Sequence, residues 1–314
     1  MNKLKDFTMR ALAWIWSKVG HVFNDETYLK VRFFLLMDKK LNLKNPQTFS
    51  EKLQWLKLYN RRPQYTKMVD KYAVKDYVAG LIGDEYVIPT LGVWNRPEDI
   101  DWDSLPNRFV LKTTHGGGSN GVVICNDKST FNKAMAIKRL KKDMKESDWR
   151  IGMEWPYKDV EHRILAEQYI CPMPNKTDLA DYKWYCFNGE PKFCQVIQDR
   201  TTKETIDFFD TEWRHQEFIG LNAKASNAKV QPKRPKDLSI QIHIAKELSK
   251  GIPFSRIDLY SVGGKTLFGE ITFFPMSGFG DFYPEKYNKI LGDLITLPSE
   301  RWGDVSNLIE QYNK

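Results

Sequence analysis

The sequence predicts an α+β protein, and three observations support this prediction. Up to about residue 65, apolar residues recur at helical spacing. From residue 108 the period changes, and runs of branched and aromatic residues typical of strands follow. Two pairs of these runs are joined by Asn188-Gly189 and Gly263-Gly264, which are hairpin turn signals. Hairpins give antiparallel sheets, so we expect α+β rather than a regular βαβ winding.

The helical part begins with an amphipathic segment over residues 4–23. Its apolar side chains lie near helical spacing, at Leu4, Phe7, Leu12, Ile15, Trp16, Val19 and Phe23. The segment lacks a small-residue cleavage site and an apolar run of about 20 residues, which argues against a signal peptide or a membrane span. Two interpretations remain open: packing against the core, or peripheral association with the cytoplasmic face of a membrane, with Trp14 and Trp16 at the interface.

The remaining elements follow from turn residues and period. We expect a helix that starts at Thr48 or Ser50, a second over 65–83, a short strand at 86–94 and a polar connector at 95–108. Later helices are expected at about 130–145 and 238–250. The expected strands are 108–114, 121–127, 163–170, 181–189, 191–199, 256–262 and 266–274.

Composition narrows the class of protein. The net charge of +8 is spread out except in the run 138–145, which is either the solvated face of a helix or a basic patch for phosphates or anionic lipid. No nucleic-acid-binding motif accompanies this run, so we expect no nucleic-acid partner. The four cysteines include no Cys-x-x-Cys pair, which argues against a disulfide framework or zinc site and fits a reducing, cytoplasmic compartment.

A glycine-rich loop, Gly116-x-Gly118-x-x-Gly121, has the letters of a dinucleotide fingerprint in a different context. In that fingerprint the glycines open a helix whose N–H groups hold the pyrophosphate. Here the loop joins two strand-like runs, which argues against NAD binding and predicts a hairpin. No Gly-Lys-Ser/Thr follows, and the His-Arg-Asp and Asp-Phe-Gly elements of kinases are missing. A hairpin of this kind can cover a triphosphate as a flap.

Oxygen-bearing side chains gather on two neighbouring strands near the C-terminus. Asp258 lies on one strand and Glu270 on the next, across a Gly-Gly hairpin. Thr272 shares a face with Glu270, and Arg256 shares a face with Asp258. Two carboxylates and a hydroxyl suit Mg²⁺, which binds through one or two carboxylates plus substrate phosphates. Arg256 could steady charge on a transferring phosphoryl group, whereas surface ion pairs are the alternative interpretation.

The order of these motifs resembles the ATP-grasp superfamily over residues 67 to about 280. The order runs from Asp70-Lys71 in a helix, through a strand ending in Lys112, the flap and the strand LAEQYI, to RID and GEITFFP. Three longer stretches are similar to the branch named for teichuronopeptide biosynthesis (TupA-like): 45–78, 109–125 and 181–193. Family enzymes have Glu-x-Asn where this chain has Glu270-x-Thr272.

The resemblance implies an ATP-grasp fold, in which two α+β subdomains sandwich ATP beside a mostly helical N-terminal region. The implied parts are a helical N-terminal region (1–66), a small lead segment (67–108), a flap subdomain (109–175), a C-terminal subdomain with the Mg²⁺ site (176–300) and a tail (301–314).

The resemblance also implies roles for individual residues. Those implied to bind ATP are Lys71 and Lys112 at the phosphates, Gly116, Gly117, Gly118, Ser119 and Asn120 in the flap, Glu167, Gln168 and Ile170 at the adenine, and Asp181 at the ribose. Lys183 and Arg256 are the implied catalytic residues, and Asp258, Glu270 and Thr272 the implied Mg²⁺ ligands. His115 beside the flap has either a structural hydrogen bond or a substrate role.

The function implied is an ATP- and Mg²⁺-dependent carboxylate–amine ligase that works through an acyl phosphate. Genes of the similar branch lie among surface-polysaccharide loci, so the expected partners are a small-molecule or saccharide acid, such as a uronic acid, and an amine. The aromatic segment 273–288 is expected either to shape the acceptor pocket or to pack in the core.

Three alternatives remain open. Asp101-Trp102-Asp103 has the Asp-x-Asp pattern of a nucleotide-sugar glycosyltransferase, although its place in a polar connector between Pro97 and Pro106 favours a surface turn. A small-molecule kinase on the ATP-grasp fold is the second alternative. A binding protein without turnover is the third, and only Thr272 in place of Asn favours it.

Overall fold

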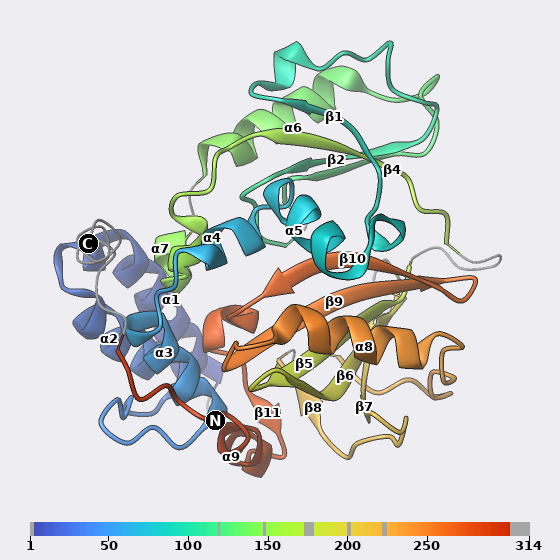
Figure 1. Cartoon of the computed structure of the whole chain (residues 1–314). Helices are drawn as coiled ribbons and strands as arrows, with labels where there is room; N and C mark the ends of the chain where they lie inside the picture. The colour runs from blue at the N-terminus through green and yellow to red at the C-terminus, as the bar shows by residue number, and fades with distance from the viewer. Residues whose placement is uncertain are drawn as a thin grey trace, which may run out of the picture.

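Two antiparallel sheets form the body of the protein, with a helical region packed beside the larger sheet (Figure 1). The computed structural model describes residues 3–118, 120–146, 149–172, 179–199, 202–221 and 225–301. The α-helices there are α1 (Lys3–Val19), α2 (Asp25–Met37), α3 (Phe49–Tyr59), α4 (Gln64–Val69), α5 (Ala73–Ile82), α6 (Lys133–Lys145), α7 (Trp149–Gly152), α8 (Leu238–Ser249) and α9 (Lys286–Asp293). The 3₁₀ helices are η1 (Gly20–Val22), η2 (Asp84–Tyr86), η3 (Pro97–Asp99), η4 (Trp155–Tyr157) and η5 (Pro275–Gly278).

The smaller sheet has the strand order β1-β4-β2-β3, from β1 (Thr90–Trp94), β4 (Ile164–Gln168), β2 (Phe109–Thr113) and β3 (Val122–Cys125). Alternate residues of β2 are buried, which gives the sheet one apolar face. That face packs with Leu140 of α6 in a core of its own. Because β1 pairs with β4, the expected lead segment 67–108 supplies an edge strand of this sheet.

The larger sheet has the strand order β10-β9-β5-β6-β7. Its strands are β5 (Asp181–Phe187), β6 (Glu190–Gln198), β7 (Thr205–Asp210), β9 (Phe254–Val262) and β10 (Lys265–Thr272), and a separate pair joins β8 (Ile219–Gly220) to β11 (Phe282–Tyr283). The predicted turns are confirmed, since all four residues of Asn188-Gly189 and Gly263-Gly264 have positive φ. Helix α8 covers one face, where Trp184 Nε1 donates to Gln241 Oε1 at 3.1 Å. The opposite face is left for polar side chains.

The helical N-terminal region shares one core with the larger sheet. Helix α3 starts as predicted at Thr48, whose side chain forms a capping box with Glu51. Phe49 then packs edge-on against Phe254 and Phe282, with ring centroids 4.8 and 5.4 Å apart. Residues 1–66 and the C-terminal strands therefore form a common hydrophobic core.

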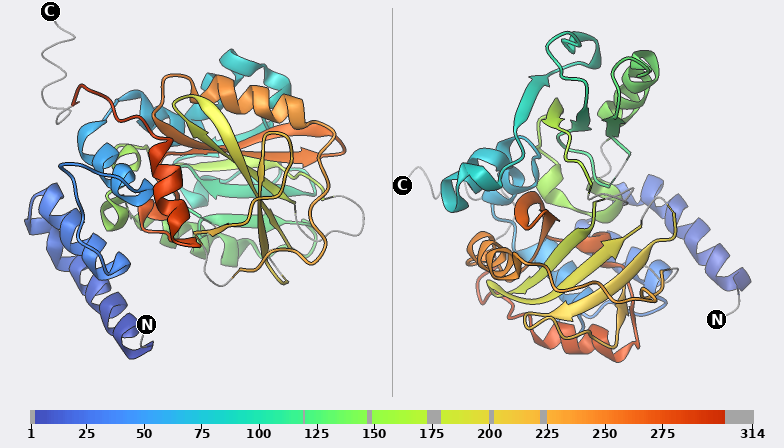
Figure 2. Two further views of the ribbon diagram at one scale, coloured as in Figure 1. Left: turned by 90° about the horizontal axis from the view of Figure 1, so that it is seen from below. Right: turned by 90° about the vertical axis from the view of Figure 1, so that its right-hand side faces the viewer.

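Helix α1 is held along one side and exposed along the other. Arg32 Nη1 donates to the carbonyl of Ala13 at 2.9 Å, and Trp16 Nε1 donates to that of Tyr28 at 3.1 Å. On the outer side, Phe7 is 72% and Trp14 65% exposed. The helix extends outward from the rest of the chain (Figure 2). The described residues contain no helix that is long and apolar enough to cross a membrane.

One helix of the sequence prediction is wrong. Residues 65–83 form two helices, α4 and α5, and Asp70-Lys71 lies in the turn between them rather than in a helix. The break occurs because Asp70 Oδ1 accepts the N–H groups of Tyr72 and Ala73 at 2.8 and 3.1 Å, which starts α5 anew. Strands β7, β8 and β11 were not expected from the sequence, whereas the helices at 130–145 and 238–250 are confirmed as α6 and α8.

Candidate active site

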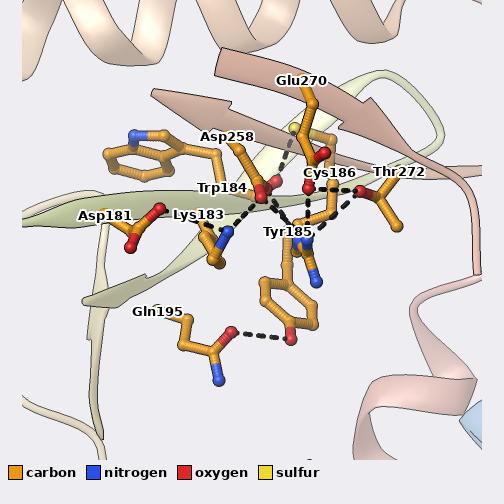
Figure 3. Close-up of polar contacts among 10 residues, drawn as sticks. Asp181, Lys183, Trp184, Tyr185, Cys186, Gln195, Asp258, Glu270 and Thr272 are labelled. Carbon is orange, nitrogen blue, oxygen red and sulfur yellow. Dashed lines mark hydrogen bonds and ion pairs between the residues drawn. The ribbon is translucent and has the colours of Figure 1, made fainter. Parts of the chain in front are cut away.

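The candidate active site lies on the polar face of β5, β9 and β10. Lys183, Asp258 and Glu270 form one row across these strands, because Lys183 pairs with Asp258 and Asp258 pairs with Glu270. The neighbouring row pairs Arg256 with Thr272 in the same way. Residues two apart on a strand share a face, so both rows point to one side of the sheet (Figure 3).

Asp258 is the most tightly bound carboxylate of the site. Arg256 donates to both of its oxygens, from Nε to Oδ1 at 2.6 Å and from Nη2 to Oδ2 at 2.7 Å, and Lys183 Nζ donates to Oδ2 as well. Burial by itself would raise the pKa of Asp258, but the charges of Arg256 and Lys183 outweigh burial and lower it to about 2. Asp258 is therefore ionised at any physiological pH.

Glu270 and Thr272 complete the cluster on β10. Arg256 Nη2 lies 3.4 Å from Glu270 Oε1 and 3.2 Å from Thr272 Oγ1, so one guanidinium spans all three oxygen-bearing side chains. The Glu270 side chain is 38% exposed, against 5% for Asp258, and is the more accessible carboxylate. The structure thus brings Asp258, Glu270, Thr272 and Arg256 together as predicted from their spacing.

The donor set fits one Mg²⁺ ion. Asp258 and Glu270 offer carboxylate oxygens and Thr272 a hydroxyl, and Mg²⁺ needs only one or two carboxylates when phosphates and water fill the other positions. Within the described residues, no three His, Cys, Asp or Glu side chains form a complete metal cluster. A metal at this site would therefore depend on substrate oxygens.

A bulge at Gly269 sets this alignment. The register of β10 against β9 shifts between Phe268 and Glu270, which leaves Gly269 as the extra residue. A Cβ at Gly269 would lie 2.9 Å from the backbone oxygen of Asp258. Glycine at this position lets the two strands approach closely enough to pair the two carboxylates.

The two lysines predicted to contact the phosphates are Lys112, on β2 of the smaller sheet, and Lys71, in the turn between α4 and α5. Lys112 shares a carboxylate partner with a third lysine, Lys75 of α5. Lys112 Nζ lies 2.5 Å from one oxygen of Glu167, and Lys75 Nζ lies 2.7 Å from the other. Burial opposes ionisation of Glu167, but the two lysines hold its pKa below the usual value. The Glu167 carboxylate is thus bound to two lysines, and its strand pairs with β1 on one side and β2 on the other, so neither the carboxylate nor the cavity lining places Glu167 at an adenine. Lys75 was missed from sequence, where it reads as an ordinary helix lysine.

Lys71 connects the turn after α4 to the flap. Its N–H donates to Thr114 O at 3.1 Å, and its Nζ donates to Gly116 O. Burial lowers the pKa of Lys71, and the charge of Glu270 is the strongest influence in the opposite direction. Lys71 is therefore close enough to Glu270 for the two charges to act on one another.

The glycine loop is the predicted hairpin between β2 and β3. Cβ atoms at Gly117 and Gly118 would meet nothing within 4 Å, so this part of the loop is open. At the base, Cβ atoms on Gly116 and Gly121 would lie 2.8 and 2.1 Å from Asp143 Oδ2, so these glycines pack over that carboxylate. Ser119 lies outside the described residues.

Asp143 anchors the base of the loop and was missed from sequence. The Thr113 hydroxyl donates to its Oδ2. The basic residues of the run 138–145 are exposed, as expected for a solvated helix face. Asp143 is the single acidic residue of this run and is buried. Its isolation among basic residues is the sequence feature that could have indicated a structural role. Asn120 O accepts from Arg139 Nε at 2.8 Å.

His115 has a structural contact at this base. Its Nε2 lies 3.2 Å from Asp143 O, and its ring stacks on His162 at 3.4 Å between centroids. Burial, followed by the charge of His162, lowers the pKa of His115. These contacts agree with the structural interpretation of His115.

A cavity of about 540 Å³ lies where the adenine was expected. It is lined from both sheets and the connecting segments by Asp84, Glu85, Val87, Pro89, Gln168, Tyr169, Ile170, Cys171, Val262, Lys265 and Leu267. Two of the three predicted hinge residues, Gln168 and Ile170, are among them. Asp181 lies elsewhere, with Oδ1 3.5 Å from Lys183 Nζ in the polar row of β5.

The Asp-x-Asp tripeptide is confirmed as a surface turn. Asp101 Oδ1 accepts the N–H groups of Asp103 and Ser104 at 3.1 and 3.3 Å, and both aspartates are exposed. Trp102 packs against the core of the smaller sheet. The carboxylate of Asp101 is thus used to build its own turn.

Two facing sheets, a glycine hairpin with lysines at its base and paired carboxylates opposite define an ATP-grasp protein. The TupA-like ATP-grasp family matches residues 51–296, and the chain belongs to that family. A search of curated proteins found no match.

Several solved ATP-grasp structures are distantly similar. The D-alanine–D-alanine ligase of Bacillus anthracis complexed with ATP is 15% identical, over 65% of this chain and 53% of that chain, with a TM-score of 0.37. The D-alanine–D-alanine ligase of Helicobacter pylori is 14% identical, over 79% and 69%, with a TM-score of 0.46. An ATP-grasp RimK domain protein of Sphaerobacter thermophilus is 12% identical, over 76% and 70%, with a TM-score of 0.41. The chain spans about half the length of the first of these, and similarities this distant carry no argument about substrate.

Proposed function

We propose that the protein is an ATP- and Mg²⁺-dependent ligase that joins an amine to a carboxylic acid through an acyl phosphate. The observation that carries the proposal is the direct pairing of Asp258 with Glu270 under Arg256, in a chain of the ATP-grasp family. Lys71 and Lys112, at the base of the flap, supply positive charge for the phosphates. The cavity beside Gln168 and Ile170 has room for the base.

In this proposal ATP supplies the phosphoryl group, and Mg²⁺ held by Asp258 and Glu270 neutralises charge on it. The chain's own contribution is to position and to stabilise charge. Arg256, which already spans the carboxylates, can turn one N–H toward a phosphoryl oxygen, and Lys183 offers a second cation in the neighbouring row. In this proposal the flap keeps water away from the acyl phosphate, which water would otherwise hydrolyse.

The two chemical steps balance without another reagent. A carboxylate oxygen of the acid forms a bond to the γ-phosphorus, and ADP leaves. The amine nitrogen then forms a bond to the acyl carbon, phosphate leaves, and the amine loses a proton. The products are ADP, phosphate and an amide.

We propose further that the acid is a uronic acid or amino acid of a cell-surface polysaccharide precursor. This rests on the resemblance to the teichuronopeptide branch and on membership of the TupA-like family. A nucleotide-sugar transferase is less well supported, because Asp101 is engaged in a turn. We place the reaction on the cytoplasmic side of a membrane, where ATP is available and the exposed apolar side of α1 could rest on lipid.

The test is to incubate the protein with ATP, Mg²⁺ and pairs of acids and amines, and to measure ADP and phosphate together. A ligase releases both in equal amounts and only when acid and amine are present. A small-molecule kinase releases ADP without phosphate, a binding protein releases neither, and a glycosyltransferase gives turnover only with nucleotide sugars. Any of these three results would overturn the proposal.

A further inference from the structure

A second polar cluster lies beyond the C-terminal end of β10, next to the proposed Mg²⁺ carboxylates. Glu154, between α7 and η4, meets Ser277 of η5, whose hydroxyl donates to Glu154 Oε1 at 2.6 Å. The charges of Arg256 and Glu270 both act on the Glu154 carboxyl, so the cluster adjoins the site. None of the roles assigned above uses Glu154.

The nearest buried cation does not neutralise Glu154 by contact. Lys57 Nζ donates to Gln54 Oε1 at 2.9 Å, Gly152 O at 2.5 Å and Ser277 O at 2.6 Å. An ammonium has three N–H groups, so all of those on Lys57 are used. Among the described residues, no Lys, Arg or His forms an ion pair with Glu154, and the hydrogen bond from Ser277 goes to Oε1 and leaves Oε2 without a donor.

Three residues close to Glu154 in the chain or in space have left-handed backbone conformations. Met276 and Ser277 have φ of 50° and 52°, and Met153 has φ of 53°, although none of them is glycine. Such left-handed residues cost of order 1 kcal/mol each and gather at functional sites. A Cβ at Gly152 would lie 2.3 Å from Ser277 Oγ and 2.9 Å from Glu154 Oε1, so glycine makes room for the pair.

Glu154 Oε2 is left for a ligand. Burial raises the pKa of Glu154, and the charge of Lys57 is the strongest effect that lowers it, but Lys57 makes no contact with the carboxylate and its N–H groups are used elsewhere. The half-buried carboxylate therefore has one oxygen that accepts no hydrogen bond from the described residues and that a second cation can reach. Primary amines reach an enzyme at neutral pH mostly as ammonium ions, with three N–H donors. An ammonium bound to Glu154 Oε2 would stand beside the phosphoryl-transfer row, where the second substrate of a ligase must wait.

We infer that Glu154 binds the amino group of the incoming nucleophile, with Ser277 and Lys57 as positioning residues that fix its carboxylate. This inference deepens the proposed ligase function and rests on it. Lys57 Nζ donates to the backbone carbonyl of Ser277, and the Ser277 hydroxyl donates to Glu154 Oε1. The site therefore selects a primary ammonium as its second substrate. The bound ammonium gives one proton to solvent before its nitrogen attacks the acyl carbon, and it loses a second proton as the amide forms.

The test compares two nucleophiles that differ in charge. Hydroxylamine is uncharged at neutral pH and traps acyl phosphates as hydroxamates, so it needs no ammonium site. Wild-type protein with ATP, Mg²⁺ and glucuronate is assayed with hydroxylamine and, separately, with glycine, L-alanine, L-glutamate and L-lysine. Glu154→Gln keeps an oxygen for the Ser277 hydroxyl and removes only the charge. We expect its hydroxamate rate within about twofold of wild type and its KM for the amine raised at least about tenfold.

Two further variants complete the design. Ser277→Ala frees the carboxylate to move, and we expect a smaller rise in amine KM at an unchanged hydroxamate rate. Glu217→Gln, on an exposed residue, should change neither. If Glu154→Gln lowers both rates alike, or leaves the amine KM unchanged in a protein of normal Tm, Glu154 is structural and the inference is wrong. If wild type forms neither hydroxamate nor amide, the ligase proposal fails and the inference fails with it.

Discussion

Asp258 and Glu270 lie directly opposite each other on β9 and β10, and the guanidinium of Arg256 contacts both. A pair of carboxylates this close repels unless a cation lies between them. Arg256 has that role in this structure, and in the proposed mechanism a divalent ion would share it when nucleotide binds. Substitutions that remove or displace one of these two carboxylates therefore test the proposed chemistry most directly.

Glu270→Ala removes the more exposed of the two carboxylates. We expect ADP formation to fall by at least about 100-fold, because charge stabilisation at a transferring phosphoryl group is worth several kcal/mol. The thermal midpoint should change little, since the Glu270 side chain is partly exposed and makes only long contacts with Arg256 and Thr272. The measurement is a coupled ADP assay over a Mg²⁺ titration, with Glu217→Gln as the control. If Glu270→Ala forms ADP as fast as wild type, Glu270 does not hold a metal ion that the reaction needs, and the proposed metal site is wrong.

Gly269→Ala tests whether the bulge sets the carboxylate pair. The added Cβ would lie 2.9 Å from Asp258 O, so one strand must shift. We expect the free energy of unfolding to fall by about 1–3 kcal/mol, and the Mg²⁺ needed for half-maximal ADP formation to rise. Gly264→Ala, in the distant hairpin turn, is the comparison, because its positive φ costs stability without moving Glu270. Equal Mg²⁺ requirements in the two variants would contradict this account of the bulge.

Asp258 should contribute to stability in a defined pH window. Its pKa is about 2 in the folded protein against 3.8 in an unperturbed chain, so the folded state holds the proton more weakly. The resulting stabilisation, about 2 kcal/mol, is fully present above pH 3.8 and is lost as the pH falls toward 2. Urea unfolding of wild type and Asp258→Asn between pH 5 and 2 measures it. The difference between the two proteins should shrink as the pH falls, and a constant difference would contradict the prediction.

Much of this site was predictable because strand patterns carry their own geometry. A period of two, with Gly263-Gly264 between the strands, is enough to place Arg256, Asp258 and Glu270 on one face. What the pattern does not contain is the shift at Gly269, which depends on how the two backbones approach. The helix break at Asp70 could not be predicted from the local sequence either. It goes with a contact distant in the chain, because the Lys71 N–H donates to Thr114 O while Asp70 Oδ1 accepts the N–H of Tyr72.

The residues missed from sequence share a physical feature. Lys75, Asp143 and Glu154 are partly or fully buried polar groups on short or helical segments, where spacing gives no hint of a partner. Each contacts a residue distant in the chain: Lys75 contacts Glu167, Asp143 contacts Thr113, and Glu154 contacts Ser277. Such pairs are set by tertiary packing, and no local pattern encodes them.

The outer side of α1 provides a prediction that is independent of the active site. Phe7 and Trp14 of α1 are 72% and 65% exposed, and Val22 of the following η1 is 73% exposed. Exposed Lys5 and Lys18 lie on the same helix. Apolar and basic side chains together favour a membrane surface with anionic lipid. We expect the protein to sediment with phosphatidylglycerol vesicles and much less with phosphatidylcholine vesicles. Trp14→Glu should lower vesicle binding at least about tenfold, because it places a charge where the helix meets the lipid. Val230→Glu, at an equally exposed apolar residue elsewhere, should bind as wild type does, and equal loss in both variants would mean that α1 is not the contact surface.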